Sequence, residues 1–274
     1  MAAHLLVRKP GRSIDRVAAH LLPGSALDEV ERSADPHAAT LALARISEAH
    51  PEFSERLDGD ARMRAAAVAV AAASPHLSRL TAMDPGALDV LADLDNRAHF
   101  DTTTATALAR SKRLELLRIA ARDLVGLDRL EAVGAALARL ADDILAASVT
   151  LALPGSGDLA IIGMGKLGGR ELNYASDIDV IFVGDNDGHA RAVLDVIRPT
   201  WRVDVDLRPE GRDGPLTRSL DSYRAYWDRW AGTWEFQALL KARPAAGDAE
   251  VGDAFMAAAG ERLWGRPFGA EELR

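Results

Sequence analysis

One short run, residues 163–183, constrains the fold of this chain more than any other segment. It joins the glycine-rich turn Gly163-Met164-Gly165-Lys166-Leu167-Gly168-Gly169 to two alternating aspartates, Asp177 and Asp179. Side chains alternate across a strand with period two, so both aspartates would point to the same face of a strand. Two carboxylates beside a turn rich in backbone N–H groups can hold a divalent cation and a phosphate. The run therefore suggests metal-dependent phosphoryl or nucleotidyl transfer.

Composition limits the classes of protein that remain. The 274 residues suffice for one large domain or two ordinary ones, and 48% are hydrophobic, enough to bury a core. The 33 basic and 41 acidic residues give a formal net charge of -8, which disfavours a broad nucleic-acid-binding surface. The lack of cysteine excludes disulfides and thiolate zinc sites. With no recognisable signal peptide and no apolar run of about 20 residues, we expect a cytoplasmic protein without a membrane role.

The first half of the sequence predicts helices. From about residue 13 to residue 148 it is rich in alanine and leucine and has no clear alternating run. The spacing of apolar residues predicts one amphipathic helix over 102–124, with Asp101 as its N-cap, and another over 128–148. The segment 65–73 is almost pure alanine and valine, which indicates a tightly packed helix rather than a binding surface.

The character of the sequence changes at the turn cluster 154–157, which predicts a domain boundary near residue 152. Beyond it, short apolar or alternating runs predict strands and periodic runs predict helices. The expected strands are 159–162, 177–183 and 201–207, and the expected helices are 190–197 and 223–240. This order of elements predicts a small α/β sheet.

The glycine turn has three competing interpretations. It satisfies the G-x-G-x-x-G pattern of dinucleotide-binding domains, but those have a full helix after the glycines and an acidic residue about 20 residues on. Asp177 lies only 14 residues after Gly163 and begins its strand. A phosphate-binding P-loop would need serine or threonine after Lys166, where the sequence has leucine. In the plain structural interpretation, the glycines turn the chain and the aspartates begin the next strand.

The segment 202–208 favours a metal site because it alternates charged with apolar residues. As a strand it would place Asp204, Asp206 and Arg208 together on one face. Two neighbouring strands would then present four carboxylates on one surface, which is unfavourable unless cations or arginines compensate them. Spacing alone does not decide whether Asp204 or Asp206 is the third ligand.

The glycine and aspartate run from Gly163 to Phe182 resembles the signature of glutamine synthetase adenylyltransferases, members of the DNA polymerase β-like nucleotidyltransferase superfamily. It is similar to the N-terminal, adenylyl-removing domain of the bifunctional enzymes, and the similarity covers about residues 95–250. Further matching segments are 207–211, 214–216 and 234–244. The resemblance implies an α+β fold with three parts. These are a helical N-terminal region over 1–152, a nucleotidyltransferase domain with a mixed sheet over 153–250, and the start of a C-terminal helical segment over 251–274.

The resemblance also implies roles for individual residues. Asp177, Asp179 and Asp204 would be the catalytic metal ligands for Mg²⁺, with Asp206 a neighbour. The residues implied to bind nucleotide or phosphate are Gly165, Lys166, Gly168, Gly169, Ser176, Arg208 and Lys241. Arg212 and Arg243 are further cationic candidates, and we expect Trp234 and Phe236 in the core.

The implied activity is removal of AMP from an adenylylated tyrosine of glutamine synthetase by phosphorolysis, which releases ADP, or its addition from ATP. The implied partners are glutamine synthetase, ATP, ADP, phosphate and a PII-type nitrogen regulator. Two alternatives remain open: a catalytically impaired docking or regulatory module for glutamine synthetase, and a nucleotidyltransferase with a small-molecule acceptor.

Two features depart from the family pattern. Only 24 residues separate Asp179 from Asp204, whereas the family has a longer crossover with a fuller helix. We therefore expect sheet order or activity to be compromised. The chain stops at Arg274, where the family continues into a second nucleotidyltransferase domain, which predicts a fragment or a shortened relative.

Overall fold

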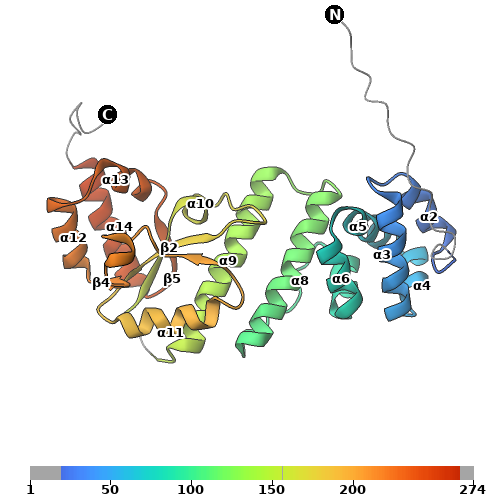
Figure 1. Cartoon of the computed structure of the whole chain (residues 1–274), viewed down its shortest axis with the longest axis horizontal. Coiled ribbons are helices and arrows are strands. Elements are labelled where there is room, and N and C mark those ends of the chain that lie inside the picture. The colour runs from blue at the N-terminus through green and yellow to red at the C-terminus, as the bar shows by residue number, and fades with distance from the viewer. Residues whose placement is uncertain (1–19, 156, 266–274) are drawn as a thin grey trace, which may run out of the picture. The chain divides into compact units, whose positions relative to one another are not determined.

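The computed structural model describes residues 20–155 and 157–265. Among these residues, contacts divide the chain into two compact units (Figure 1). The helical unit lies within Met1–His99 and Arg113–Arg129, and the sheet unit lies within Phe100–Lys112 and Leu130–Arg274. Helix α8, Ala105–Leu124, contributes residues to both units.

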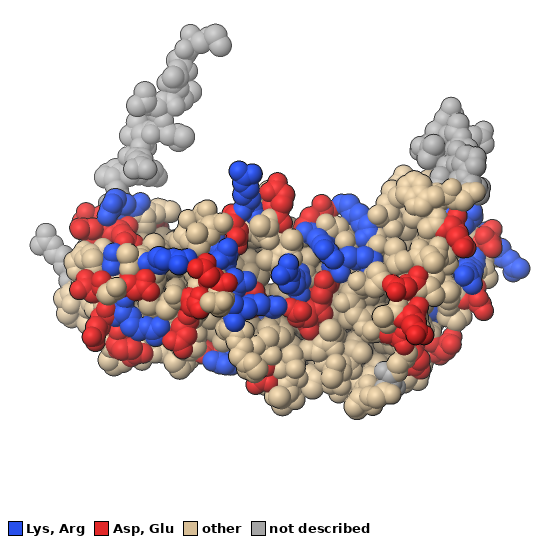
Figure 2. Space-filling model, turned by 180° about the vertical axis from the view of Figure 1, so that it is seen from behind, with Lys and Arg blue, Asp and Glu red and all other residues tan. Residues whose placement is uncertain are grey.

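The described surface carries charges of both signs. On the face drawn in Figure 2, lysine and arginine side chains lie among aspartate and glutamate side chains, and acidic groups interrupt the basic ones. None of the described helices has the length and apolar content needed to span a membrane.

The helical unit consists of short helices, of which α3, α5 and α6 begin at a side-chain cap. The carboxylates of Asp35 and Asp60 and the hydroxyl of Ser74 each accept hydrogen bonds from backbone N–H groups of the helix that follows. Such caps satisfy donors that have no partner within the helix. The helices are α2 Gly24–Glu31, α3 Pro36–Ala49, α4 Phe53–Gly59, α5 Ala61–Ala73, α6 Pro75–Met83 and α7 Gly86–Ala92.

Helix α5 confirms the interpretation of the alanine-rich segment as a packed helix. It contacts α2, α3, α4, α6 and α7. Its small side chains allow these neighbours to approach closely, because alanine fills little of the space between two backbones. The buried residues of α5 are Met63, Ala66, Ala67, Val68, Val70 and Ala71.

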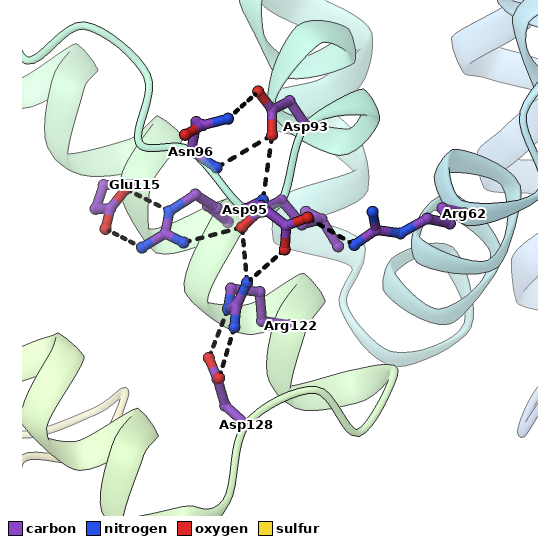
Figure 3. A network of polar contacts seen from close by, with 9 residues as sticks. Arg62, Asp93, Asp95, Asn96, Glu115, Arg122 and Asp128 are labelled. Atoms are coloured by element: carbon purple, nitrogen blue, oxygen red, sulfur yellow. Dashed lines mark hydrogen bonds and ion pairs between the residues drawn. The ribbon is translucent and has the colours of Figure 1, made fainter.

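A network of ion pairs fixes the segment after α7 to the second part of α8 (Figure 3). Arg118 donates through two nitrogens to the buried carboxylate of Glu115, at 2.8 and 2.9 Å. Arg122 forms a similar pair with Asp128, at 2.7 and 2.8 Å, and this guanidinium lowers the pKa of the Asp128 carboxyl. Both arginines also donate to the backbone oxygen of Leu94. The network extends through Arg62, Asp93, Asp95 and Asn96.

Helices α8 and α9 confirm the two amphipathic helices, with shifted ends. Helix α8 begins at Ala105 rather than residue 102, and α9 spans Leu130–Ala152. The expected N-cap role of Asp101 is wrong, because the Asp101 carboxylate accepts hydrogen bonds from Thr103. Instead, the Thr104 hydroxyl accepts the Ala107 N–H at 3.1 Å.

The sheet unit contains a mixed sheet in the order β3-β2-β1-β5, which confirms the α+β class. Strand β1 pairs antiparallel with β2 and β5, whereas β2 pairs parallel with β3 and then with β4 along its other edge. The strands are β1 Ala160–Gly163, β2 Ile178–Val183, β3 Val203–Asp204, β4 Thr217–Arg218 and β5 Arg243–Gly247.

Helices cover the sheet on both sides. Helix α9 packs against β5 and α11, and α14 packs against β5 and β1 (Figure 1). On the α14 side, the rings of Tyr223, Trp227 and Phe255 lie 5.1–5.7 Å apart, and the Tyr223 hydroxyl donates to the Phe182 backbone oxygen at 3.1 Å. The remaining helices are α10 Gly165–Gly168, α11 Asp187–Ile197, the 3₁₀ turn Gly211–Asp213, α12 Leu220–Arg229, α13 Thr233–Leu239 and α14 Ala249–Trp264.

Three expectations for this unit need correction. The strand expected over 201–207 is confined to β3, because the chain turns away after Asp204. The helix expected over 223–240 is two helices, separated at Gly232, where the Glu235 side chain accepts the Gly232 N–H and starts α13. The core position expected for Trp234 is wrong, since this residue is 58% exposed, whereas the buried position of Phe236 is confirmed.

The short crossover from β2 to β3 leaves the parallel pairing of β3 with β2 intact, so the expected loss of sheet order is wrong, while its effect on activity stays a prediction. Helix α11 has eleven residues, and Ala190, Val193, Leu194 and Ile197 form its buried side. This side packs on α9 and returns the chain for parallel pairing of β3 with β2.

Contacts group α9 with the sheet rather than with the preceding helices. The boundaries expected near residues 152 and 250 stay a prediction. Of the segment 251–274, helix α14 covers the part that the structure describes as regular, and residues 266–274 lie outside the described residues.

Candidate functional site

The glycine turn forms one helical turn, α10, directly after β1. Gly165 has φ +50°, a left-handed conformation that favours glycine, and a Cβ atom there would overlap the Asp179 carboxylate. A Cβ on Gly168 would lie 2.7 Å from the Gly163 oxygen and still closer to the Lys241 backbone oxygen. Glycine therefore permits the close approach of this turn to β2 and to the chain before β5.

A second tight turn leads into β2. The Ser176 hydroxyl accepts the Asn173 N–H at 3.3 Å, and the Asn173 side-chain oxygen accepts the Ala175 N–H at 3.1 Å. The indole N–H of buried Trp201 donates to the Ser176 backbone oxygen at 3.0 Å. These bonds fix the backbone immediately before Asp177, so Ser176 borders the carboxylates.

The structure brings Asp177, Asp179 and Asp204 together. Asp179 and Asp204 occupy paired positions in the parallel register of β2 and β3, so their side chains leave the sheet on the same face. Asp177 precedes β2 by one residue and lies two residues from Asp179, which places it at the same edge. All three residues are partly buried.

The three carboxylates repel one another. Burial raises the pKa of the Asp179 carboxyl above its ordinary value, and the Asp204 and Asp177 carboxylates raise it further, whereas Lys166 lowers it. Because the Asp179 carboxylate faces the other two, its ionised form is destabilised in the folded chain. A bound cation would reverse this effect, since an opposite charge favours the ionised form.

We expect Asp179→Asn to stabilise the metal-free chain at about pH 7, by about 0.5–1 kcal/mol. A folded pKa that lies above the unfolded one contributes stability below the unfolded value, and this stability is lost as the pH rises through the folded value. Asparagine has no such charge, so the gain should shrink toward about pH 4. Urea denaturation in the presence of a chelator measures this difference, with Asp206→Asn as the control. A variant less stable than wild type at neutral pH would contradict the assigned repulsion.

Asp206 and Arg208 do not extend the strand face of Asp204 as expected, because β3 ends at Asp204 and the chain turns. Past β3, the Asp206 N–H donates to the Asp204 carboxylate at 2.8 Å, and the Asp206 carboxylate pairs with Arg212 at 2.7 Å. Arg208 is buried and donates to the backbone oxygens of Val205, Gly214 and Pro215. Arg208 therefore closes the loop after β3 and leaves Asp204 as the carboxylate beside Asp179.

The other cationic candidates surround the glycine turn. Lys166 is exposed on α10 and acts electrostatically on Asp179. The Lys241 ammonium forms an ion pair with Glu171, and its backbone oxygen faces Gly168. Arg243 donates to the Asp142 carboxylate at 2.9 Å and to the Leu167 oxygen at 3.0 Å, which ties β5 to α9 and α10.

Two further charged residues lie at this edge, and the sequence patterns assigned a role to neither. Arg202 donates through Nε to an Asp177 carboxylate oxygen, and Glu171 pairs with Lys241. The signal for Arg202 was the period of two, which puts it on the same face of the strand as Asp204. No local pattern announced Glu171, because its partner is 70 residues away along the chain.

The donor set suits a hard divalent cation, since carboxylate oxygens are the ligands that magnesium and calcium prefer. Among the described residues, no three acidic or histidine side chains are already arranged as a metal-binding group. Asp177 instead pairs with Arg202, while Asp179 and Asp204 share a register position. The fit to a cation therefore rests on the type and placement of the carboxylates.

Three carboxylates on adjacent parallel strands, beside a glycine turn, are typical of nucleotidyltransferases that act through metal ions. The chain belongs to the glutamate-ammonia ligase adenylyltransferase family, whose model matches residues 97–199 and 196–258. The two matched segments meet at residues 196–199, where α11 ends and the short crossover continues toward β3.

Individual proteins similar to this chain carry a corresponding name. The chain is 38% identical over 280 residues to a bifunctional glutamine synthetase adenylyltransferase/adenylyl-removing enzyme of Streptomyces avermitilis, covering 87% of this chain and 28% of the relative. Proteins of the same name are 43% identical over 185 residues in Cutibacterium acnes (57% of this chain, 19% of the relative) and 49% identical over 144 residues in Mycobacterium tuberculosis H37Rv (48% and 14%). The chain thus spans less than a third of the length of these relatives.

Proposed function

We propose that the sheet unit carries a nucleotidyl-transfer site that acts on glutamine synthetase. In the proposed reaction, inorganic phosphate attacks the phosphorus of a tyrosine-linked AMP and releases ADP and free tyrosine. The paired register of Asp179 with Asp204, beside Asp177 and the glycine turn, carries this proposal. Family membership and the names of the relatives support the choice of glutamine synthetase.

Asp177, Asp179 and Asp204 would hold Mg²⁺, and displacement of Arg202 would free Asp177 for this role. When bound, the cation would supply positive charge that stabilises the adenylyl group being transferred and the leaving phenolate. The Gly165 backbone, pressed against Asp179, fixes where this carboxylate lies. Lys166 adds positive charge at the same edge.

The proposed reaction needs no acid or base from the protein with a shifted pKa. A phosphate oxygen forms a bond to the AMP phosphorus, and the bond from that phosphorus to the tyrosine oxygen breaks. The departing phenolate takes a proton from water, because the ordinary pKa of tyrosine is about 10. Addition of AMP from ATP would use the same carboxylates with pyrophosphate as the leaving group. A PII-type protein is the proposed regulator.

Incubation of the purified chain with adenylylated glutamine synthetase, magnesium and phosphate tests the proposal. We expect ADP to accumulate in proportion to the AMP lost from glutamine synthetase, as measured by coupled ADP detection and by intact mass. Omission of phosphate should prevent ADP formation. If ADP does not form under conditions where a full-length relative works, the alternative of a docking or regulatory module is favoured, and binding to glutamine synthetase then tests that alternative.

A further inference from the structure

Arg202 lies next to Asp177 because of the register of the sheet. Ile178 of β2 lies opposite Val203 of β3. The Ile178 N–H donates to the Arg202 backbone oxygen at 3.1 Å. One position earlier, Arg202 is therefore beside Asp177. Because side chains alternate, Arg202 also shares a face with Asp204. The edge thus presents a two-by-two group of three carboxylates and one guanidinium.

The Arg202 guanidinium is attached to this group through Asp177. Its Nε donates to an Asp177 carboxylate oxygen, and the structure gives the Arg202 side chain no second ion pair within the described residues. The Arg202 side chain is 76% exposed and the Asp177 side chain is 35% exposed, so solvent surrounds the guanidinium of this pair. Exposed ion pairs of this kind are weak and open readily. Arg202 is therefore held well enough to occupy Asp177 and loosely enough to leave it.

We propose that Arg202 competes with the divalent cation for Asp177 and so weakens the affinity of the site for metal. The inference rests on the proposed metal site of the preceding section and concerns how that site is tuned. A cation bound directly to Asp177 needs the carboxylate oxygen that Arg202 occupies. The apparent affinity of a site equals its intrinsic affinity multiplied by the fraction of molecules in which the site is free. Arg202 is thus a positioning residue, which acts on the metal through Asp177.

The size of the effect follows from two contributions. An exposed pair keeps the carboxylate occupied in most but not all molecules, and the positive guanidinium repels a cation held close to it. Together they should raise the dissociation constant of the cation by about 3- to 10-fold. Removal of Arg202 should therefore tighten cation binding by that factor.

Arg212 is a matched control because it carries the same charge in a similar pair near the site. It donates to the Asp206 carboxylate, its side chain is 86% exposed, and it is close enough to Asp204 to act on it electrostatically. Removal of either arginine changes the net charge by one unit. Only Arg202 occupies one of the three carboxylates directly. The two variants therefore separate occupation of Asp177 from general electrostatics.

Mn²⁺ binding to the purified chain, followed by electron paramagnetic resonance of the free ion, tests the proposal without any turnover. We expect Arg202→Gln to lower the Mn²⁺ dissociation constant by about 3- to 10-fold. We expect Arg212→Gln to change this constant by less than about 2-fold. Arg202→Lys should resemble wild type because it keeps a cation beside Asp177. Thermal unfolding of each variant verifies that it is folded.

The outcomes distinguish this inference from the proposed function. Wild-type binding that is lost in Asp179→Asn but unchanged in Arg202→Gln overturns the role of Arg202 alone. Equal tightening in Arg202→Gln and Arg212→Gln also overturns it, because net charge would then explain the effect. Binding that persists in Asp179→Asn, or no Mn²⁺ binding by any variant, overturns the metal site itself and the inference with it.

Discussion

Replacement of Asp177 and Asp179 together by asparagine should lower the rate of ADP release by about 1,000-fold or more, which corresponds to about 4 kcal/mol of transition-state stabilisation. Asparagine keeps the size of aspartate but removes the charge that a divalent cation requires. Since the three carboxylates repel one another in the metal-free chain, the double variant should remain folded. Initial rates of ADP formation with adenylylated glutamine synthetase measure the loss.

Single variants of the two aspartates after the crossover sharpen this prediction. Asp204→Asn should lose activity almost as strongly as the double variant, because Asp204 is paired in register with Asp179. Asp206→Asn should change the rate by less than about 3-fold, because the Asp206 carboxylate is turned toward Arg212. Equal losses in the two variants, or a larger loss in Asp206→Asn, would mean that the ligand set is wrong.

The second large effect is expected on stability. Gly168→Ala should lower the free energy of unfolding by about 3 kcal/mol, because the added Cβ would overlap two backbone oxygens that cannot move independently. These oxygens belong to Gly163 at the end of β1 and to Lys241 before β5. The end of β1 and the chain before β5 would therefore have to move away from the turn. Urea denaturation followed by tryptophan fluorescence measures the change.

Gly169→Ala is the matched control for this prediction. Its φ of -72° is accessible to alanine, and a Cβ there would meet the side chains of Glu171 and Lys241 at 3.2 Å. Both side chains are exposed and end in flexible groups that can shift. We expect a loss below about 1 kcal/mol. Similar losses at Gly168 and Gly169 would indicate that the turn does not make the close backbone approach described above.

The predictable part of the fold is the part with strong periodic patterns. Strands β1 and β2 and helices α8, α9 and α11 follow apolar spacings that their burial satisfies. The juxtaposition of Asp177 with Asp179 follows from alternation within one segment. These features are local, so a few neighbouring residues suffice to indicate them.

The features that were not predicted depend on distant pairing. Strand β5 contains Pro244 and two alanines, a composition that disfavours strands, and it forms because β1 offers it a free edge. Strand β4 has only two residues, too few for any periodicity. The end of β3 at Asp204 depends on Arg208, whose burial against carbonyl oxygens no local spacing indicates.

The same distinction applies to the site. Spacing left Asp204 and Asp206 equivalent, and the resemblance to a family favoured Asp204. In the structure, the turn after β3 directs Asp206 toward Arg212, so only Asp204 stays beside Asp179. The roles of these residues in metal binding and transfer stay a prediction until the variants above are measured.

Because the crossover between β2 and β3 is short, its length decides which side chain of β3 lies beside Asp179. Residues 198–202 connect α11 to β3, and the pairing of Asp179 with Asp204 depends on their number. Deletion of one residue from this link, with the helix held in place, would bring Val205 beside Asp179 and turn Asp204 to the opposite face. In-frame insertions and deletions here would thus act as substitutions of the third carboxylate, so natural length variation in this link should occur in steps that preserve the face of Asp204.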